Sequence, residues 1–407
     1  MTSNADGYLY YRAPAGIVRV GTGNPRQIIR SIIRHFLVYL SGQSLSLTSI
    51  WVPVNMTEEF MKWKVAEFPR NVNAGHNALR SVREMCDELK IGRTATLISG
   101  EKTMKAAGKE VAEYMSGYDL DVCLIGDATM ENVKTAENQI REFKSDFILA
   151  VGGGSKIDTA KVVSKDLDIP FISIPTSASH DGIASNRASL KTPAGSKSIE
   201  SGSPMGIIAD TAVISKAPYR LLAAGCADVI SNLTALKDWD FAKRLTNESY
   251  SGTAYTLSKY AAESVMSSAD KIKPGLETSV WLAIKPIILS GISINIAGSS
   301  RPTSGAEHMI SHRLDLTCPG RALHGEQCGV ASILTMYLHG GDWKSIRDAL
   351  RMIGAPTTAR GLGITKDQMI DAMVHAHEIR SDRFTILGTT GISEEVAMTV
   401  ASETGVI

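Results

Sequence analysis

Three consecutive glycines directly after an apolar run constrain the fold of this chain more than any other feature of its sequence. The run Phe147–Val151 is typical of a buried β-strand, Gly152, Gly153 and Gly154 follow it, and Ser155–Lys161 then reads as a helix. Glycines let a backbone approach a diphosphate, and a helix N-terminus offers free N–H groups and a favourable dipole. The segment predicts a nucleotide-phosphate site. Its spacing is neither the dinucleotide fingerprint nor the P-loop, and a turn that only packs a helix on a sheet stays an alternative.

Strand-like and helix-like segments alternate through the first half of the chain. The helical segments are His76–Leu89, Thr103–Met115 and Glu131–Phe143, and the strand segments are Thr94–Ser99, Val122–Ile125 and Phe171–Ile174. Such alternation indicates βαβ units and a parallel sheet. After Pro218 long helical segments dominate: Tyr219–Thr234, Thr253–Ser267 and Ser279–Ala297. We therefore expect an α/β domain with a parallel sheet that binds NAD(P), over residues 56–217. An all-helical domain over 218–407 is expected to bind metal and substrate, with the site in the cleft between them.

The first 55 residues differ in composition from the rest. They contain no lysine, a single acid (Asp6) and five arginines. A segment of this kind is compatible with a transit peptide or with a weakly ordered extension. Because the composition changes abruptly near Met56 and ordinary lysine use begins at Lys62, we favour a third interpretation. On that interpretation residues 1–55 are upstream sequence attached to a protein that starts at Met56.

The bulk composition excludes several classes of protein. Lysine and arginine number 43 against 42 acids, a net charge of +1, so the sequence indicates neither nucleic acid nor another polyanion as a partner. The five cysteines are scattered, which argues against disulfides and a thiolate metal site and for the reducing cytoplasm. The apolar stretch Val280–Gly298 is interrupted by Lys285 and Pro286, so it predicts a buried core helix and no membrane span.

Hydroxyl groups gather after the predicted strand Phe171–Ile174. The residues that follow are Pro175, Thr176, Ser177, Ala178, Ser179, His180, Asp181 and Gly182. Hydroxyls beyond the carboxyl end of a parallel strand suit contacts to ribose, amide or phosphate oxygens. The same residues also favour an ordinary Asx- or Ser-turn, so this segment alone does not decide between a ligand loop and a plain loop.

Histidine is sparse in this chain, yet three of its nine histidines fall in one short stretch. His308 and His312 share one face if residues 305–314 are helical, and His324 opens another apolar helical run. Upstream, Asp228 stands in an apolar helix, where a lone carboxylate is costly unless it is paired or binds a metal. Two imidazoles and one carboxylate would leave zinc the open position that a catalytic site needs. From spacing alone His312 is as good a ligand as His308, and each residue could instead be an ordinary core or surface group.

At these motifs the chain resembles the sn-glycerol-1-phosphate dehydrogenases of archaea, part of a wider group with glycerol dehydrogenases, iron-type alcohol dehydrogenases and dehydroquinate synthases. The matching segments are Gly152–Lys161, Ala178–Ser185, Cys226–Asn232, Gly305–His312 and His324–Gln327. The likeness runs from about Pro69 to the C-terminus, and the segment 178–185 is the most particular to this family. One departure lies beside that segment, because Asn186 stands where the resemblance leads us to expect proline.

The resemblance implies a role for each matching position. For the cofactor it implies contacts from Gly152, Gly153, Gly154, Ser155, Lys156, Ile157, Asp158, Thr176, Ser177, Ala178, Ser179 and Ser185, the last near the nicotinamide. Asp228, His308 and His324 match zinc ligands, and Asp228 is also implied to touch the substrate. Asp181 and His312 match substrate-binding positions, so the resemblance moves His312 from the metal to the substrate.

The reaction that the resemblance implies is the reversible reduction of dihydroxyacetone phosphate to sn-glycerol 1-phosphate by NADH or NADPH, which supplies the glycerophosphate backbone of archaeal membrane lipids. One zinc ion per subunit would polarise the C2 carbonyl, and His312 or a water would relay the proton. Two alternatives are a polyol dehydrogenase acting on an unphosphorylated alcohol and a dehydroquinate-synthase-like lyase. The lyase would leave NAD unchanged after turnover. We expect a homo-oligomer.

Two binding details stay open at this point. After the first predicted strand, Glu101 could bind the ribose of NAD while Lys102 could meet the 2′-phosphate of NADP, and the resemblance implies that both cofactors are used. The substrate phosphate needs cations or N–H groups. Arg187, Lys191 and Lys197 are candidates, although a solvated charged loop explains them equally well.

Overall fold

The computed structural model describes residues 2–3, 9–13, 16–20, 66–192 and 195–407. The chain divides into two compact units, Met1–Lys64 and Val65–Ile407. In the first unit, β1 (Thr2–Ser3), β2 (Leu9–Ala13) and β3 (Gly16–Val20) form an antiparallel sheet. Residues 21–65 lie outside the described residues, and the predicted start at Met56 lies there with them.

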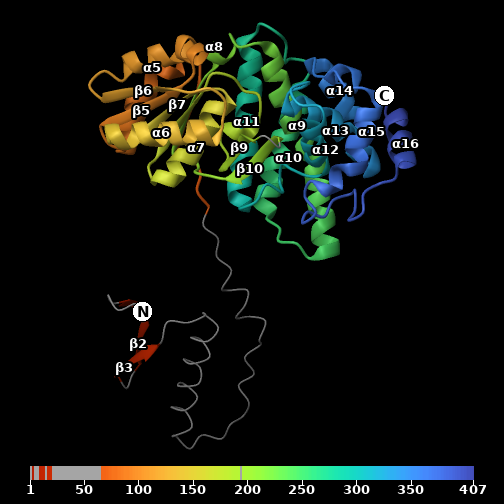
Figure 1. Ribbon diagram of the computed structural model, residues 1–407, viewed down its shortest axis with the longest axis horizontal. Helices are drawn as coiled ribbons and strands as arrows, with labels where there is room; N and C mark the ends of the chain where they lie inside the picture. The colour runs from red at the N-terminus through yellow and green to blue at the C-terminus, as the bar shows by residue number, and fades with distance from the viewer. Residues whose placement is uncertain (1, 4–8, 14–15, 21–65, 193–194) are drawn as a thin grey trace, which may run out of the picture. The chain divides into compact units, whose positions relative to one another are not determined.

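A six-stranded parallel sheet organises the first half of the second unit (Figure 1). Its strands are β4 (Asn71–Gly75), β5 (Thr94–Ser99), β6 (Asp119–Leu124), β7 (Phe147–Gly152), β8 (Phe171–Pro175) and β11 (Gly206–Asp210). They pair in the order β4-β11-β8-β7-β5-β6, each neighbouring pair parallel, which confirms the predicted sheet. The chain runs outward from β5 to β6 and then returns to place β7 on the other side of β5. Ligands of parallel sheets bind at the carboxyl ends of the strands that flank such a reversal.

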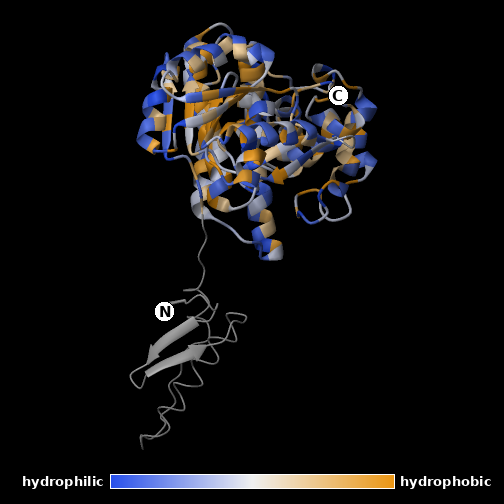
Figure 2. Cartoon of the chain, turned by 60° about the vertical axis from the view of Figure 1, so that its left-hand side comes forward, coloured by the Kyte–Doolittle hydropathy of each residue, from blue (hydrophilic) through white to orange (hydrophobic). Residues whose placement is uncertain are grey.

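Alternate side chains of the strands face two layers of helices. The covering helices are α3 (Val82–Leu89), α5 (Lys109–Tyr114), α6 (Met130–Phe143) and α7 (Gly154–Leu167). On β7, Ile148 and Ala150 pack with α6 and α7, whereas Leu149 and Val151 pack with α3 and α5. Both faces of β7 are therefore buried, which explains its uninterrupted apolar run. Figure 2 shows these apolar strands enclosed by helices that carry hydrophilic residues.

Several elements differ from the patterns read in the sequence. The strands β4 and β11 were not predicted, nor was the antiparallel hairpin of β9 (Arg187–Thr192) and β10 (Gly195–Glu200). The hairpin is rich in hydroxyls and lysines and half exposed, so it lacks the apolar signal of the other strands. The helical segment predicted over Thr103–Met115 is confirmed, but it is not a regular α-helix throughout. A π-helical turn (Met104–Gly108) joins α4 (Glu101–Thr103) to α5, and the Met104 side chain lies against Gly108, where a Cβ would collide with it.

The second half of the unit is helical, as predicted. Its helices are α9 (Tyr219–Thr246), α10 (Gly252–Ser267), α11 (Glu277–Ala297), α12 (Ala306–Thr317), α13 (His324–Leu338), α14 (Trp343–Ile353), α15 (Lys366–His375) and α16 (Glu394–Glu403). Shorter turns are η1 (Ala78–Ser81), η3 (Asp181–Ile183), α8 (Thr211–Ile214), η4 (Arg360–Leu362) and η5 (Ala376–Glu378). The long helix α9 packs against α10, α11, α12 and α13 (Figure 1). Helix α11 is apolar and long enough to cross a membrane, but 67% of its apolar window is buried and it packs on α9 and α10, so it is the core helix that the sequence predicts.

Candidate active site

The loops after β5 and β7 enclose a cavity of about 650 Å³ at the carboxyl edge of the sheet. One wall is formed by Gly100–Thr103 and another by Gly153–Lys156. Helix α7 begins at Gly154, so its unpaired N–H groups lie at this cavity. The predicted strand, glycine turn and helix are confirmed. Their place at the reversal of strand order suits the diphosphate of a dinucleotide.

The predicted cofactor residues divide into those that line a cavity and those that lie beneath it. Gly153, Gly154, Ser155, Lys156, Ser177 and Ser179 line the cavity at the glycine turn, and Asp158 and Ser185 line the neighbouring one. Gly152, Ile157, Thr176 and Ala178 line neither, and Ile157 is fully buried in the core. The Asp158 carboxylate accepts hydrogen bonds from Lys161 Nζ at 3.1 Å and from the Ser189 N–H at 3.2 Å. Asp158 thus ties α7 to β9, and its contact with the cofactor stays a prediction.

The neighbouring cavity, of about 360 Å³, holds the predicted metal and substrate residues. Gly154, Ser155 and Ser179 line both cavities, so a molecule bound at the glycine turn can reach into this second one. The helical half of the unit supplies the opposite wall through α9, α12 and the start of α13. A nicotinamide placed here would therefore face the histidines that the sequence singled out.

Asp228, His308 and His324 come from three different helices and meet at one point. The Nε2 atoms of His308 and His324 each lie 3.8 Å from Asp228 Oδ1. That oxygen is buried and has no hydrogen-bond partner among the described residues. Ligand atoms of a tetrahedral zinc ion lie roughly 3.3–3.4 Å apart, so a small inward movement would complete the set. An orphaned carboxylate oxygen facing two imidazole nitrogens fits a bound metal ion.

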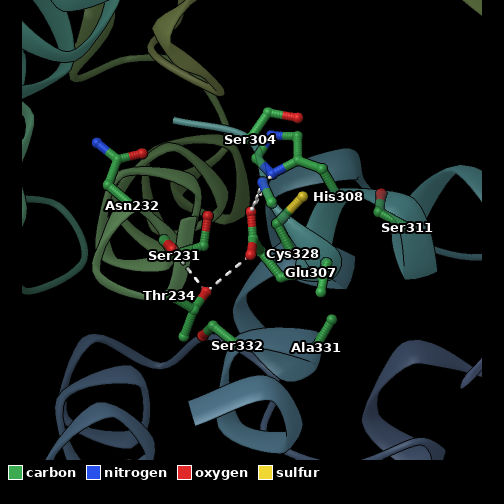
Figure 3. Close-up of polar contacts among 12 residues, drawn as sticks. Ser231, Asn232, Thr234, Ser304, Glu307, His308, Ser311, Cys328, Ala331 and Ser332 are labelled. Atoms are coloured by element: carbon green, nitrogen blue, oxygen red, sulfur yellow. Dashed lines mark hydrogen bonds and ion pairs between the residues drawn. The ribbon is translucent and has the colours of Figure 1, made fainter. Parts of the chain in front are cut away.

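The imidazole rings of His308 and His324 are each fixed by a hydrogen bond at Nδ1. Glu307 accepts a hydrogen bond from His308 Nδ1 at 2.9 Å, and Ser311 Oγ lies 3.0 Å from His324 Nδ1. Glu307 itself accepts from Thr234 Oγ1 at 2.9 Å (Figure 3). It also accepts from the Gly305 N–H at 2.6 Å. A bond at Nδ1 fixes the tautomer and leaves Nε2 for a metal, and a carboxylate partner also raises the ligand's basicity. The sequence analysis missed Glu307, although it directly precedes a predicted ligand.

The protonation of the three imidazoles reflects this environment. Burial opposes a charge on His308, but its contacts with Cys328 and Glu307 raise its pKa well above the ordinary value. Burial, followed by the neighbouring histidines, lowers the pKa of His312 and of His324 well below it. Burial also raises the pKa of Asp228.

His312 and Asp181 lie beside the three candidate ligands, on the same cavity. The His312 ring stacks on His324 with centroids 5.7 Å apart, and its Nδ1 is buried without a hydrogen-bond partner among the described residues. The Asp181 N–H donates to Asp228 Oδ2 at 3.2 Å, while its carboxylate accepts from Ser290 Oγ at 2.9 Å. Burial and the nearby Asp228 raise the pKa of Asp181 to about 6. Both residues line the cavity beside the candidate ligands, and their contact with the substrate stays a prediction.

Cys328 joins the candidate metal group, which the sequence analysis did not foresee. Its Sγ lies 3.6 Å from His324 Nε2, within a cluster formed with Asp228 and His308. Burial raises the pKa of the thiol to about 11, so it is protonated in the metal-free protein. Its position one helical turn after His324 on α13 was the signal available in the sequence. All five cysteines are free and buried, which agrees with the predicted absence of disulfides among the described residues.

A glycine lets the helices that carry the ligands approach each other. A Cβ at Gly325 would collide with the backbone carbonyl oxygen of Ala224 on α9 and would lie 3.1 Å from the Asp228 Cβ. The start of α13 therefore sits directly on α9, and this places His324 beside Asp228. Only glycine permits that approach, since the obstructing atom belongs to the backbone.

The departure from the family at Asn186 has a structural counterpart. The Asn186 N–H donates to Asn295 Oδ1 at 2.8 Å, and Asn295 Nδ2 donates to the Ala184 carbonyl at 3.2 Å. Proline lacks the N–H that this bond requires. The loop after Asp181 is thus anchored to α11 by a side-chain amide at the position where we expect proline from the resemblance.

Comparison with known proteins identifies close relatives. The family described as iron-containing alcohol dehydrogenase matches residues 73–218. A glycerol-1-phosphate dehydrogenase [NAD(P)+] of Methanosphaerula palustris is 49% identical over 342 residues, 84% of this chain and 94% of the relative. The protein with the same name in Methanothermobacter thermautotrophicus is 48% identical over 343 residues, 84% of this chain and 98% of the relative.

Solved structures show the same fold at low sequence identity. A probable glycerol dehydrogenase from Sinorhizobium meliloti has a TM-score of 0.69 at 19% identity and covers 84% of this chain and 98% of its own. Glycerol dehydrogenase from Schizosaccharomyces pombe has a TM-score of 0.70 at 16% identity and covers 84% of this chain and 90% of its own. The order of an α/β half followed by a helical half is therefore shared with these structures.

Proposed function

We infer the reaction from the family of this chain and from the residues of its site. The chain belongs to the NAD(P)+-dependent glycerol-1-phosphate dehydrogenases within the iron-containing alcohol dehydrogenase group. It is an oxidoreductase that reduces dihydroxyacetone phosphate to sn-glycerol 1-phosphate with NADH or NADPH, reversibly. The cofactor occupies the cavity at the glycine turn, between the loops after β5 and β7. Residues 56–217 are proposed to bind the cofactor and residues 218–407 the metal and the substrate.

We propose that one zinc ion per subunit is held by Asp228, His308 and His324. The observation that supports this most directly is the buried, unpartnered Oδ1 of Asp228, faced by two Nε2 atoms whose rings are fixed through their other nitrogen. Zinc bound by three protein ligands acts as a Lewis acid that polarises a carbonyl group. The resemblance, and no feature of the geometry alone, favours zinc over another divalent ion.

The chain's own residues position the substrate and handle the proton. Asp181 and His312 flank the place of the reacting carbon, with Asp228 shared between metal and substrate. Because the pKa of His312 is lowered, its ring is neutral near pH 7. Because the Nδ1 of His312 has no partner among the described residues that could return a proton, the proton that the product hydroxyl needs comes from solvent, through a water that the neutral His312 ring orients. The substrate cavity is contiguous with the cofactor cavity at Gly154 and Ser155, which allows hydride to pass directly.

We further propose a cytoplasmic homo-oligomer that supplies the glycerophosphate backbone of membrane lipids. The free, buried cysteines support a location in a reducing compartment, and the burial of α11 indicates a core helix and no membrane span. At the adenosine end, Glu101 and Lys102 both line the cofactor cavity. Glu101 can accept from the ribose hydroxyls of NAD, and Lys102 can pair with the 2′-phosphate of NADP. Both cofactors are therefore expected to support turnover.

The experiment that tests the function follows NADH and NADPH oxidation with dihydroxyacetone phosphate and resolves the product chirally. We expect sn-glycerol 1-phosphate as the product. Metal content is measured in parallel on the wild type, on His308→Ala and on the surface control His375→Ala. His308→Ala should lose the bound metal and at least about a hundredfold in turnover, whereas the control should keep both. Full metal occupancy and turnover in His308→Ala would refute the ligand assignment, and cofactor left unchanged after turnover would point to a lyase.

A further inference from the structure

Two arginines that lack a carboxylate partner line the active-site cavity, and a third, Arg383, shares a hydrogen-bond acceptor with one of them. Arg187, the first residue of β9, and Arg380, which follows η5, both line the cavity that contains the metal residues. Arg383 does not line the cavity, but it donates to Ser300 Oγ at 2.9 Å, the same hydroxyl that Arg380 reaches at 3.5 Å. Within residues 66–192 and 195–407, no ion pair within 4.0 Å joins any of the three to an acid. This part of the cavity wall therefore carries guanidinium groups that no ion pair among the described residues neutralises.

Other cations nearby are neutralised, which makes the three arginines distinct. Arg301 forms a two-point ion pair with Glu248, and Lys161 pairs with Asp158 at 3.1 Å. Lys191, one of the phosphate candidates from the sequence, pairs with Asp127 at 2.9 Å. A second candidate, Lys197, is exposed and does not line the cavity. Of the three phosphate candidates from the sequence, Arg187 is therefore the one that lines the cavity without an ion-pair partner among the described residues.

The surroundings of these arginines are costly for a cation without an anion. Arg187 Nε is buried and has no hydrogen-bond partner among the described residues. Burial, then the neighbouring Arg380, lowers the pKa of Arg383 to about 9. Burial likewise lowers the pKa of Arg380, and the charge on Arg187 adds to the effect. Like charges held together away from water are stabilised by a bound anion, and the planar guanidinium suits the paired oxygens of a phosphate.

We propose that Arg187 and Arg380, supported by Arg383, bind the phosphate group of the triose phosphate substrate. This proposal rests on the proposed function and names the part of the site that selects a phosphorylated substrate. The hydroxyls of Ser300, Thr303 and Ser304 line the same wall and can donate to phosphate oxygens. Residue 304 lies just before α12, the helix that carries His308 and His312, so the anion site and the metal site share one rigid support.

The cofactor's own phosphates have a separate place. The diphosphate fits at the glycine turn, where Gly153 and Lys156 line the first cavity and the arginines do not. Arg380 instead follows η5, which packs on α12 in the helical half. The arginine wall thus belongs with the substrate residues, and its loss should spare cofactor binding.

The test compares Arg187→Ala and Arg380→Ala with Lys197→Ala, which removes a positive charge from the same hairpin at an exposed position. Inorganic phosphate is the probe, titrated by calorimetry into the full-length holoenzyme with saturating NADH. We expect its affinity to fall about 10–100-fold in each arginine variant and to stay within twofold in the control. kcat/KM for dihydroxyacetone phosphate should fall by a similar factor, mostly through KM, while the dissociation constant of NADH stays unchanged. Arg380→Lys and Arg187→Lys, which retain the charge, should recover part of the phosphate affinity.

Each outcome decides the matter. Unchanged phosphate affinity in folded variants with wild-type melting temperatures would overturn the proposal, and so would a loss of NADH affinity, which would assign the arginines to the cofactor. If an alanine variant fails to fold, the lysine variants carry the test: phosphate affinity equal to wild type in both, with no change in KM, would overturn it. A wild-type enzyme that binds phosphate but does not reduce dihydroxyacetone phosphate would instead refute the proposed function and leave the anion site standing.

Discussion

Glu307→Gln separates the charge behind a metal ligand from the shape of the site. Glu307 is fully buried, and its carboxylate accepts from three donors: His308 Nδ1, the Gly305 N–H and Thr234 Oγ1. Glutamine has the same shape, and its amide oxygen can still accept from the first two. Its NH₂ group can donate to Thr234 Oγ1, because that hydroxyl already has another acceptor in the Ser231 carbonyl at 2.8 Å. The hydrogen bonds survive the substitution, and only the negative charge is lost.

The expected effect follows from that charge. Burial would raise the pKa of Glu307, but the bonds from His308 and Gly305 lower it below its usual value, so the residue is ionised. A carboxylate behind a ligating imidazole raises its basicity, and removing such a partner typically weakens metal binding about 10–100-fold, or about 1.4–2.7 kcal/mol. Glu307→Ala should do more damage. It leaves two buried donors, His308 Nδ1 and the Gly305 N–H, without an acceptor, at about 1–3 kcal/mol each, and should lower the melting temperature of the metal-free protein as well.

The assay is competition for zinc with a chromophoric chelator, combined with thermal unfolding of the metal-free protein. Asp238→Asn is the matched control. Asp238 is also fully buried and accepts from a histidine, His339 Nε2 at 3.0 Å, and from two backbone N–H groups, those of Ala306 and Ile386. His339 takes no part in the metal group, so the control should lose stability and keep its zinc affinity. Zinc affinity equal to wild type in Glu307→Gln would refute the reasoning.

Two further predictions concern pH and helix packing. Asp181→Asn should stabilise the metal-free protein above pH 6 and leave its stability unchanged below pH 4. Burial raises the folded-state pKa of Asp181 to about 6, above its value in the unfolded chain. The wild type therefore loses stability as pH rises from 4 to 6, by at most about 3 kcal/mol, and the asparagine variant does not. Urea unfolding at pH 4 and pH 8 measures this, and equal effects at both values would contradict it. Gly325→Ala should push α13 away from the Ala224 carbonyl and separate His324 from Asp228, lowering stability by about 1–3 kcal/mol and releasing metal. Metal content and melting temperature test it, and a variant with full zinc and unchanged stability would show that the helices have room.

The sequence predicted which residues gather at the candidate metal site, because histidine is rare in this chain and these side chains follow helical spacing. His308 and His312 are four residues apart, and Asp228 stands out as a carboxylate among apolar neighbours. The spacing could not decide between His308 and His312. The two rings differ in their contacts, because Glu307 holds His308 with Nε2 toward Asp228, whereas His312 lies with Asp315 and His324 in a second group of possible ligands and its Nδ1 has no partner among the described residues. That difference lies in the tertiary contacts of each ring, which local periodicity does not encode.

Strands could be predicted from the sequence where both of their faces are buried and apolar, and they were missed where only one face is buried. β7 was found from its uninterrupted apolar run, but the hairpin of β9 and β10 resembled a polar loop. This omission concealed the substrate side of the site. Arg187 looked like one charge in a solvated loop because its partner in the cavity wall, Arg380, lies far away in the sequence. Both belong to the wall only because the hairpin and the turn after η5 converge on α12. A basic cluster assembled from distant segments leaves no local pattern in the sequence. It can be recognised only in the structure, which shows that no carboxylate pairs with these arginines among the described residues.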